Sequence, residues 1–116
     1  MEDGLRSLEK FVSRIRQEDA TIQIQVVATL LEVADNEGMS VTDIARKVGS
    51  ALSSTSRNLA ALSDRHWQKT KSGQPKPGLG LVELRIDPMN SRSKQVFLTS
   101  KGKQLLNEAL ENRKEN

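Results

Sequence analysis

The sequence predicts a mostly α-helical domain with one small β-hairpin near its C-terminal end. Over most of the chain, apolar residues recur every three or four positions, which is the spacing of helices that bury one face. After residue 80, two short segments instead alternate apolar and polar residues, as half-buried strands do. A chain of 116 residues has the length of one domain and can bury a modest core, so we assign residues 1–116 to a single domain.

Two helices are predicted in the first third of the chain. The first covers about residues 2–17 and the second about residues 20–35, before the turn-forming sequence DNEG. The second has the broader apolar face, so we expect it to be the most buried helix. The apolar residues of the first helix are Leu5, Leu8, Phe11, Val12 and Ile15.

A helix-turn-helix is predicted at about residues 40–65. Ser40 followed by Asp43 resembles a capping box, and Gly49 can adopt the left-handed conformation that ends a short helix. The residues expected to face inward from the next helix are Leu52, Thr55, Leu59 and Leu62. Two short helices joined by a tight turn are typical of a DNA-binding unit, but any helical hairpin in a small bundle would give the same pattern.

The remaining segments predict a linker, a hairpin and a last helix. Residues 66–80 read as a long basic linker without a regular element, because HWQKTKSGQPKPGLG is rich in Gly, Pro and Lys. Residues 81–98 predict two strands around a long polar turn, and residues 100–113 a helix that Thr99 can cap. The strand residues expected to face inward are Val82, Leu84, Ile86, Val96 and Leu98.

This order of elements is that of a winged helix-turn-helix domain with flanking N- and C-terminal helices. Positive charge is concentrated in one part of it: residues 65–103 hold nine Lys or Arg and two Asp or Glu, whereas residues 1–39 hold four and eight. Such a basic segment either attracts a polyanion or is a solvated loop. Beside a recognition helix, a polar and cationic hairpin tip would reach the DNA backbone or the minor groove.

The sequence LVELRIDPMNSRSKQVFLTSKGKQLL resembles the wing and last helix of the MarR family of bacterial transcription regulators. The residues that match the family's spacing are Leu81-Val82, Arg85, Asp87-Pro88, Arg92, Val96, Leu98-Thr99 and Lys101-Gly102. The segment SSTSRNLAAL is similar to the family's recognition helix. Asn90 and Ser91 depart from the pattern, because the family has an Asp and an Arg there that brace the wing. The linker at residues 66–80 is longer than usual in the family.

The resemblance covers roughly residues 26–110 and implies a sequence-specific regulator that binds double-stranded DNA, with repression as the expected outcome. It also implies a homodimer and a cytoplasmic, nucleoid-associated location in a bacterium. The apolar faces of the two terminal helices exceed what one small core needs, which supports a dimer. The candidate dimerisation residues are Leu5, Leu8, Val12, Leu106, Ala109 and Leu110.

Candidate DNA contacts lie on the outward face of the second helix of the helix-turn-helix and on the wing. Small hydroxyl side chains would let the helix sit deep in a major groove, where Arg57 could bind a guanine edge or a phosphate. Each serine could instead be a solvent-facing or capping hydroxyl, and Arg57 could pair with Asp64. The candidates are Ser50, Ser53, Ser54, Arg57, Asn58, Arg85, Asn90, Arg92 and Lys94. Trp67 is expected to cover an edge of the core rather than to stack on a base.

The composition argues against an enzyme. The chain has no Cys or Tyr and one His, so no catalytic constellation or metal site is evident and no cofactor is expected. Few aromatic residues are available to line a pocket, and a small-molecule effector is not indicated. The N-terminus lacks the apolar core of a signal peptide, and no apolar run is long enough to span a bilayer.

One other class of function fits the same features. A winged helix can also serve as a protein–protein adaptor that does not bind DNA. The acidic N-terminal region and the Pro-containing linker at residues 66–80 would then contact a regulatory protein partner. A steep fall in duplex-DNA affinity with rising salt would favour the DNA-binding regulator.

Overall fold

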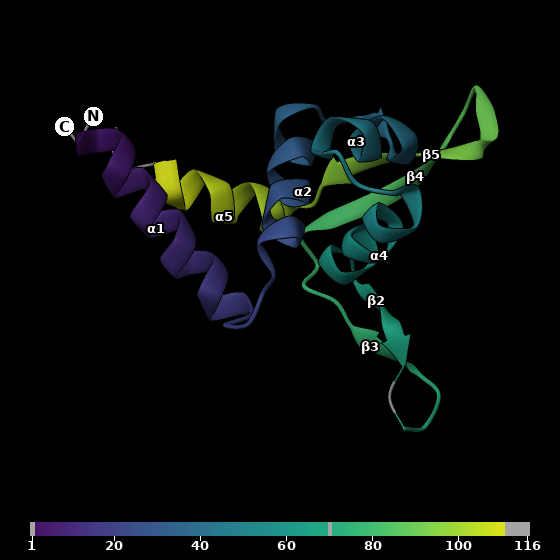
Figure 1. Cartoon of the computed structure of the whole chain (residues 1–116), viewed down its shortest axis with the longest axis horizontal. Helices are drawn as coiled ribbons and strands as arrows, with labels where there is room; N and C mark the ends of the chain where they lie inside the picture. Colours follow the sequence, from purple (N-terminus) through teal and green to yellow (C-terminus); the bar gives the residue numbers. More distant parts are fainter. Residues whose placement is uncertain (1, 70, 111–116) are drawn as a thin grey trace.

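Helices surround a small antiparallel sheet in the computed structural model, which describes residues 2–69 and 71–110 (Figure 1). Side chains are described for residues 4–64, 71–74 and 77–110. The helices are α1 (Glu2–Glu18), α2 (Ile24–Asp35), α3 (Val41–Val48), α4 (Leu52–Leu62) and α5 (Ser100–Leu110). The strands are β1 (Met39–Ser40), β2 (Arg65–Lys69), β3 (Pro75–Pro77), β4 (Val82–Asp87) and β5 (Asn90–Leu98). The architecture is a winged helix-turn-helix with flanking helices, as predicted.

The helix-turn-helix consists of α3 and α4, and its local signals are confirmed. The Asp43 N–H donates a hydrogen bond to Ser40 Oγ at 3.1 Å, which caps α3. Gly49 has a φ of 73° and ends α3 in the left-handed conformation. Thr55, Leu59 and Leu62 of α4 are fully buried, as their spacing predicts.

The prediction that Leu52 faces inward is wrong. Leu52 is the first residue of α4 and its side chain is 51% exposed. It borders the surface hollow next to the wing instead of the core. Helical spacing alone could not distinguish these positions, because a residue at the end of a helix can share the apolar face and still lie beyond the neighbouring elements.

The sheet has the strand order β1-β5-β4, with antiparallel pairing throughout. The wing hairpin pairs Val82 with Leu98 at its base and Ile86 with Lys94 near its tip. The predicted long turn is shorter than expected, because β5 already begins at Asn90 and pairs there with Asp87. Residues 91–93 have no opposite residue on β4, so the strand bulges at the tip. The short strand β1 carries too few residues to give a sequence pattern.

The prediction that Ile86 faces inward with Val82 and Leu84 is also wrong. Its side chain is 64% exposed, whereas Val82 is buried. The hairpin extends past the helices beyond Leu84, so the alternation continues along the strand where there is no core left to cover it (Figure 1).

The core joins the sheet to every helix. Four residues of α2 are buried, which agrees with the expectation for this helix: Val26, Thr29, Leu30 and Val33. This helix starts four residues later than predicted, because Thr21 donates two hydrogen bonds to Asp19 Oδ1 and holds a turn. On α1, Phe11 and Ile15 are buried. The α5 helix starts where predicted, with the Gly102 N–H bound to Thr99 Oγ1, and the predicted residues 111–113 lie outside the described residues.

The prediction of a linker without a regular element at residues 66–80 is wrong. Here β2 and β3 pair antiparallel, with Arg65 opposite Pro77 and Lys69 opposite Pro75. Pro and Gly act as breakers in a central strand, but Pro is compatible with the open edge of a two-stranded hairpin. Figure 1 shows this hairpin projecting from the end of α4, away from the wing.

Among the described helices, none has the length and apolar character needed to cross a bilayer.

Candidate nucleic-acid interface

The α4 helix forms a ridge between two surface grooves. We call the groove toward the wing the wing-side groove; α4 lines it with Leu52, Ser56 and Ala60, and the wing with Arg92, Ser93 and Lys94. We call the other the hairpin-side groove; α4 lines it with Ser54, Arg57, Asn58 and Ala61. Its opposite walls are the α1–α2 connection and residues 77–79, at the end of β3 and just after it. The major groove of DNA is wide enough to admit an α-helix that projects in this way.

The ridge itself is polar, small and exposed. Ser53, Ser54 and Arg57 are exposed, as predicted, and Asn58 is half-buried at the edge. Ser56 is also exposed and lies on the wing-side flank, although the sequence prediction did not include it. A helical wheel could have identified Ser56. Ser56 lies one turn after Leu52 on the same side of the helix, so placing Leu52 inward excluded Ser56 from the predicted outward face.

Ser50 lies apart from this ridge. It precedes the first residue of α4, and its hydroxyl oxygen accepts a 2.5 Å hydrogen bond from Gln25 Nε2 of α2. This bond fixes the start of α4 against α2. The side chain of Ser50 is half-buried, and its contact positions the helix.

The tip of the wing presents cationic side chains to solvent. Arg92 and Lys94 are exposed, and neither has an ion-pair partner among the side chains that the structure describes. Asn90 Oδ1 accepts a hydrogen bond from the Arg92 N–H at 3.1 Å, which shapes the backbone where the strand bulges. An uncharged Asn can thus order this turn without the ion pair that the resemblance implies for an Asp.

Arg85 is held on the outer face of the sheet. Its Nη2 lies 2.7 Å from Glu83 Oε2, and its guanidinium carbon lies 4.0 Å above the centre of the Phe97 ring. These two contacts turn the guanidinium toward its own sheet. The geometry favours a structural role for Arg85, with a general contribution to the positive field.

The grooves separate the two arginines that the sequence prediction emphasised. Arg57 borders the hairpin-side groove, and Arg92 borders the wing-side groove. They therefore lie on opposite flanks of α4. A helix in a major groove has a phosphate strand on each side, so cations on both flanks match the charge of such a site.

No group of three or more His, Cys, Asp or Glu side chains that could hold a metal ion occurs among the described residues. The side chains of His66 and Trp67, including the predicted core contact of Trp67, lie outside the described residues.

Near the start of α3, Arg46 donates a 2.7 Å hydrogen bond to Asp43, which lowers the pKa of that exposed carboxyl.

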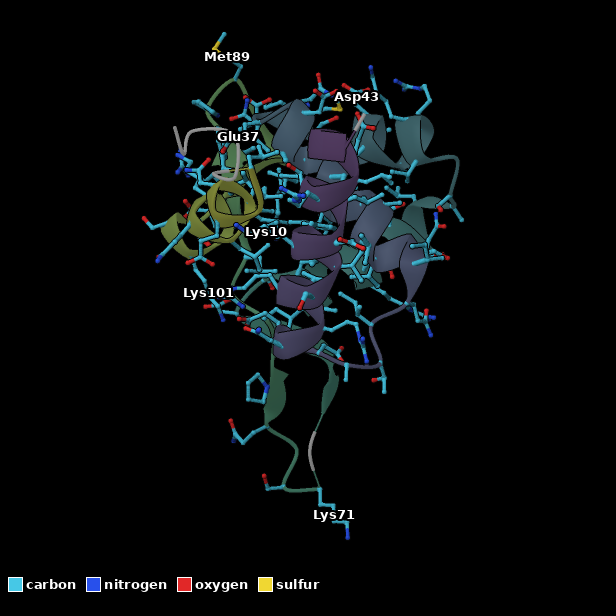
Figure 2. The ribbon with its side chains drawn as sticks, turned by 90° about the vertical axis from the view of Figure 1, so that its left-hand side faces the viewer. Lys10, Glu37, Asp43, Lys71, Met89 and Lys101 are labelled. Atoms are coloured by element: carbon cyan, nitrogen blue, oxygen red, sulfur yellow. The ribbon has the colours of Figure 1, made fainter. Side chains whose placement is uncertain are left out.

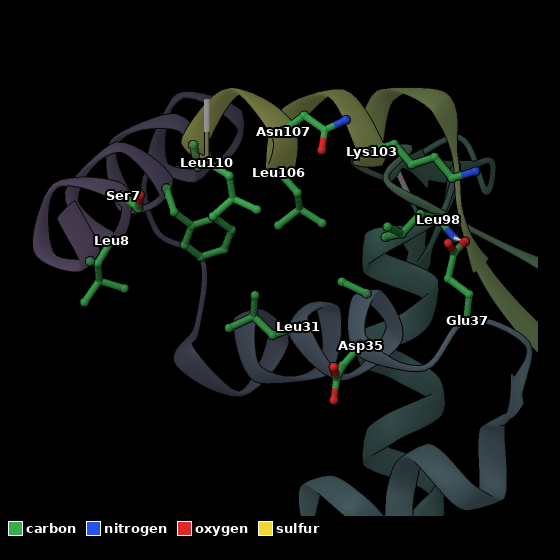
Figure 3. A pocket seen from close by; sticks show the side chains of 14 residues that line it. Ser7, Leu8, Leu31, Asp35, Glu37, Leu98, Lys103, Leu106, Asn107 and Leu110 are labelled. Carbon is green, nitrogen blue, oxygen red and sulfur yellow. Dashed lines mark hydrogen bonds between the residues drawn. The ribbon is translucent and has the colours of Figure 1, made fainter. Parts of the chain in front are cut away.

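A second candidate surface lies at the other end of the molecule, in an apolar hollow between α1, α2 and α5 (Figure 3). Leu106 and Leu110 point toward Leu31 across this hollow, and Leu8 lies at its rim. Of the predicted dimerisation residues, the exposed ones are Leu5, Leu8, Val12 and Leu110. Leu106 is half-buried, and Ala109 is 3% exposed, so its side chain packs in the chain's own core.

Comparisons with known proteins establish the type of fold. No family model matches the sequence, and no curated protein sequence matches it. Among solved structures, the MepR–DNA complex from Staphylococcus aureus aligns with a TM-score of 0.67 at 20% identity, covering 92% of this chain and 75% of that one. A MarR transcriptional regulator from Methanosarcina mazei aligns with a TM-score of 0.64 at 21% identity, covering 91% and 65%.

Two further structures agree. The transcriptional repressor CouR bound to a 23-mer DNA duplex aligns with a TM-score of 0.60 at 26% identity, covering 94% of this chain and 66% of that one. The PcaV transcriptional regulator from Streptomyces coelicolor, in complex with its natural ligand, aligns with a TM-score of 0.57 at 19% identity, covering 76% and 52%. This chain therefore spans about half to three quarters of the length of these proteins. The fold is a MarR-like winged helix.

Proposed function

We propose that this chain is a cytoplasmic transcriptional regulator that binds double-stranded DNA, with α4 in the major groove and the wing at the adjacent backbone or minor groove. One observation carries the proposal: the exposed polar ridge of α4 lies between two grooves, and each groove has a cationic side chain on its border. MepR and CouR, which share the fold, are described as complexes with DNA. Repression is the expected mode of action.

The side chains of the ridge suit close approach to base edges. Ser53, Ser54 and Ser56 are short, so α4 can enter deeply before its backbone meets the walls of the groove. Their hydroxyl groups can donate to or accept from bases and phosphates. Arg57 is the long cation of the ridge and is suited to a guanine edge or a phosphate, and Arg92 is suited to a phosphate or to the minor groove.

The proposal predicts that duplex DNA binds at low salt and is lost steeply as salt rises, because bound cations release the counterions of the phosphates. The double variant Arg57→Ala/Arg92→Ala should weaken binding by about 30-fold or more, since each specific arginine contact is worth about 1–3 kcal/mol. Fluorescence anisotropy with a labelled duplex measures this. Circular dichroism should be unchanged, because Arg57 and Arg92 are both exposed.

A matched control removes two cationic residues elsewhere. Arg6 and Lys10 are exposed on α1 and are not among the residues that line the two grooves, and Arg6→Ala/Lys10→Ala deletes the same charge. We expect a loss of less than about 10-fold, from the general field alone. Binding by the Arg57/Arg92 variant that equals the binding of this control would refute the site assignment.

We also propose that the chain acts as a homodimer. The apolar hollow between α1, α2 and α5 is bordered by exposed Leu8 and Leu110, and a second copy of the chain would cover both. A two-fold dimer would present two copies of α4 to two half-sites of a palindromic operator.

A further inference from the structure

The β2–β3 hairpin is a second basic hairpin, on the opposite flank of α4 from the wing. Residues 65–77 include four Lys or Arg and no Asp or Glu. In Figure 1 the hairpin continues from the end of α4 and projects away from the body. Figure 2 places Lys71 at its tip and Met89 at the tip of the wing, at opposite ends of the view. The molecule therefore carries two projecting hairpins with α4 between their bases.

Four consecutive backbone hydrogen bonds attach the base of this hairpin to the end of α4. The N–H groups of residues 78–81 donate to the carbonyl oxygens of Asp64, Ala61, Ser63 and Leu62, at 3.1, 3.0, 3.0 and 2.7 Å respectively. Ala61 and Leu62 belong to the last turn of α4, whose carbonyl groups have no partner within the helix, so two of these bonds satisfy them. Ser63 and Asp64 follow the helix, and their two bonds hold the segment after β3 against the end of α4.

Gly78 makes this attachment close. A Cβ atom at this position would overlap the carbonyl oxygen of Ser63 and would lie 3.0 Å from that of Ala61. Only a residue without a side chain lets the two backbones approach this far. An isolated two-stranded hairpin is marginally stable in water, and this attachment supplies the support that the hairpin itself lacks.

The attachment also sets where the hairpin leaves the body. Pro77, Gly78 and Leu79 form one wall of the hairpin-side groove, and Arg57 and Asn58 of α4 form the other. The base of the hairpin therefore borders the same groove as Arg57. When α4 occupies a major groove about 12 Å wide, a phosphate strand lies along each of its flanks.

We infer that the β2–β3 hairpin is a second wing, which binds the DNA backbone on the strand opposite to the one that β4–β5 contacts. Its ligand is the phosphate groups of double-stranded DNA, and its basic residues are Arg65, Lys69, Lys71 and Lys76. The inference rests on the proposed function. The hairpin adds affinity and salt dependence, and it does not read the base sequence, because lysines bind phosphates as point charges.

A simpler explanation for part of this composition is protection of the strand edges. Lys and Pro on exposed edges prevent pairing with other chains. Lys is the charge most used for that purpose, so the composition of residues 65–77 fits both explanations. Edge protection, however, gives no reason for the hairpin base to border the groove that contains Arg57.

The test compares two triple variants of the full chain on a duplex of arbitrary sequence, about 30 base pairs long, which spans about three helical turns. The hairpin variant is Lys69→Gln/Lys71→Gln/Lys76→Gln, and the control is Arg6→Gln/Lys10→Gln/Lys103→Gln on exposed positions of α1 and α5. Both remove three positive charges. Binding is measured by anisotropy between about 50 and 200 mM salt, and folding by circular dichroism.

We expect the slope of log K against log salt to become shallower by about 2 to 3 for the hairpin variant, and by less than about 1 for the control. Equal slopes for the two variants, in a wild type that binds the duplex, overturn this inference and leave the proposed function intact. Failure of the wild type to bind any duplex at low salt overturns the proposed function and this inference with it. A hairpin variant with wild-type affinity and slope likewise overturns the inference.

Discussion

Gly102 lies in the first turn of α5, with its α-carbon against the backbone of Leu81. A Cβ atom there would overlap the Leu81 carbonyl oxygen. That carbonyl also accepts a hydrogen bond from the Thr99 N–H at 3.0 Å, and Leu81 is fully buried, so the backbone has little room to retreat. Helix propensity alone favours Ala over Gly by about 1 kcal/mol, so propensity and packing make opposite predictions for Gly102→Ala.

We predict that packing dominates and that Gly102→Ala lowers the free energy of unfolding by about 1–3 kcal/mol, the usual cost of overpacking. Urea denaturation followed by circular dichroism measures the change. Gly4 is the matched control, because it lies in α1 and a Cβ atom added to it would meet no atom of the described residues within 4 Å, apart from its chain neighbours and the nearby backbone of its own helix. Gly4→Ala should leave stability unchanged or raise it by up to about 1 kcal/mol. A Gly102→Ala protein as stable as wild type would contradict the close packing of α5 on Leu81.

Single residues of α4 also show what the sequence could predict. Thr55 and Leu59 follow the helical period and are buried, as expected. Leu52 follows the same period but is exposed. Its burial depends on which elements pack against the end of α4, and the apolar period of the sequence gives no information about them. The error moved the predicted outward face and omitted Ser56. The sequence predicts Arg57 and Arg92 as surface residues, but their placement on opposite flanks of α4 follows only from the folded arrangement.

At the scale of elements, α1 is tied to α5 by a network of charged side chains. Glu18 Oε2 lies 2.7 Å from Arg14 Nη1, and Glu18 Oε1 lies 2.8 Å from Lys101 Nζ. Arg14 also contacts Glu108 at 3.0 Å. The hydrogen bonds from Lys101 and then from Arg14 lower the pKa of Glu18 below its ordinary value of 4.5, and its side chain is only 16% exposed.

This network predicts how stability depends on acid. A carboxyl group whose pKa falls on folding contributes its full stabilisation above its unfolded pKa and loses it as the pH falls through the lower, folded pKa. Glu18→Gln should therefore lower the free energy of unfolding by about 1 kcal/mol at pH 7. The difference from wild type should stay constant down to about pH 5 and shrink below about pH 4.5. Urea denaturation at several pH values measures it.

Glu9→Gln serves as the control for this prediction, since Glu9 is exposed on the same helix. The control should match wild type at every pH. A difference between Glu18→Gln and wild type that does not change between about pH 7 and about pH 3 would contradict the assignment of the acid dependence to Glu18.

The elements themselves were predictable to different degrees. The described helices have amphipathic periods or caps of their own, and the two wing strands alternate apolar and polar residues, so the local sequence is enough to predict them. The predicted start of α2 is too early, because the side chain of Asp19 binds Thr21 and holds a turn that the apolar pattern does not register. Strand β1 has two residues and exists through its pairing with Gln95 and Val96, so it has no local signal. The β2–β3 hairpin resembles a linker in sequence because Pro and Gly mark both loops and open edges.

At the scale of the whole molecule, the two candidate surfaces lie at opposite ends. Figure 1 shows α1 and α5 together at one end, and α4, the wing and the β2–β3 hairpin toward the other. A partner bound to the α1–α5 end would therefore leave α4 open to DNA. The same end holds the apolar hollow and exposed leucines, for which a second copy of the chain is the proposed occupant. Dimerisation and DNA binding can thus be tested separately by substitutions at the two ends.

We predict that the wild type sediments as a dimer at tens of micromolar and that Leu8→Glu converts it to a monomer. Leu8 is 57% exposed and borders the apolar hollow, so the substitution should cost the isolated fold little, while a buried carboxylate in the interface would be strongly unfavourable. Sedimentation velocity measures the mass, and circular dichroism checks the fold. Leu52→Glu is the matched control, because Leu52 is 51% exposed on the border of the wing-side groove.

The control protein should remain a dimer and bind duplex DNA more weakly, since its new carboxylate would face the phosphates. Leu8→Glu should keep measurable affinity for a single half-site and lose the tighter binding to a palindrome, because two linked half-sites raise the effective concentration of the second contact. A wild type that sediments only as a monomer at tens of micromolar would disprove the dimer and leave half-site binding in place. A Leu8→Glu protein that stays dimeric would place the interface elsewhere on the chain.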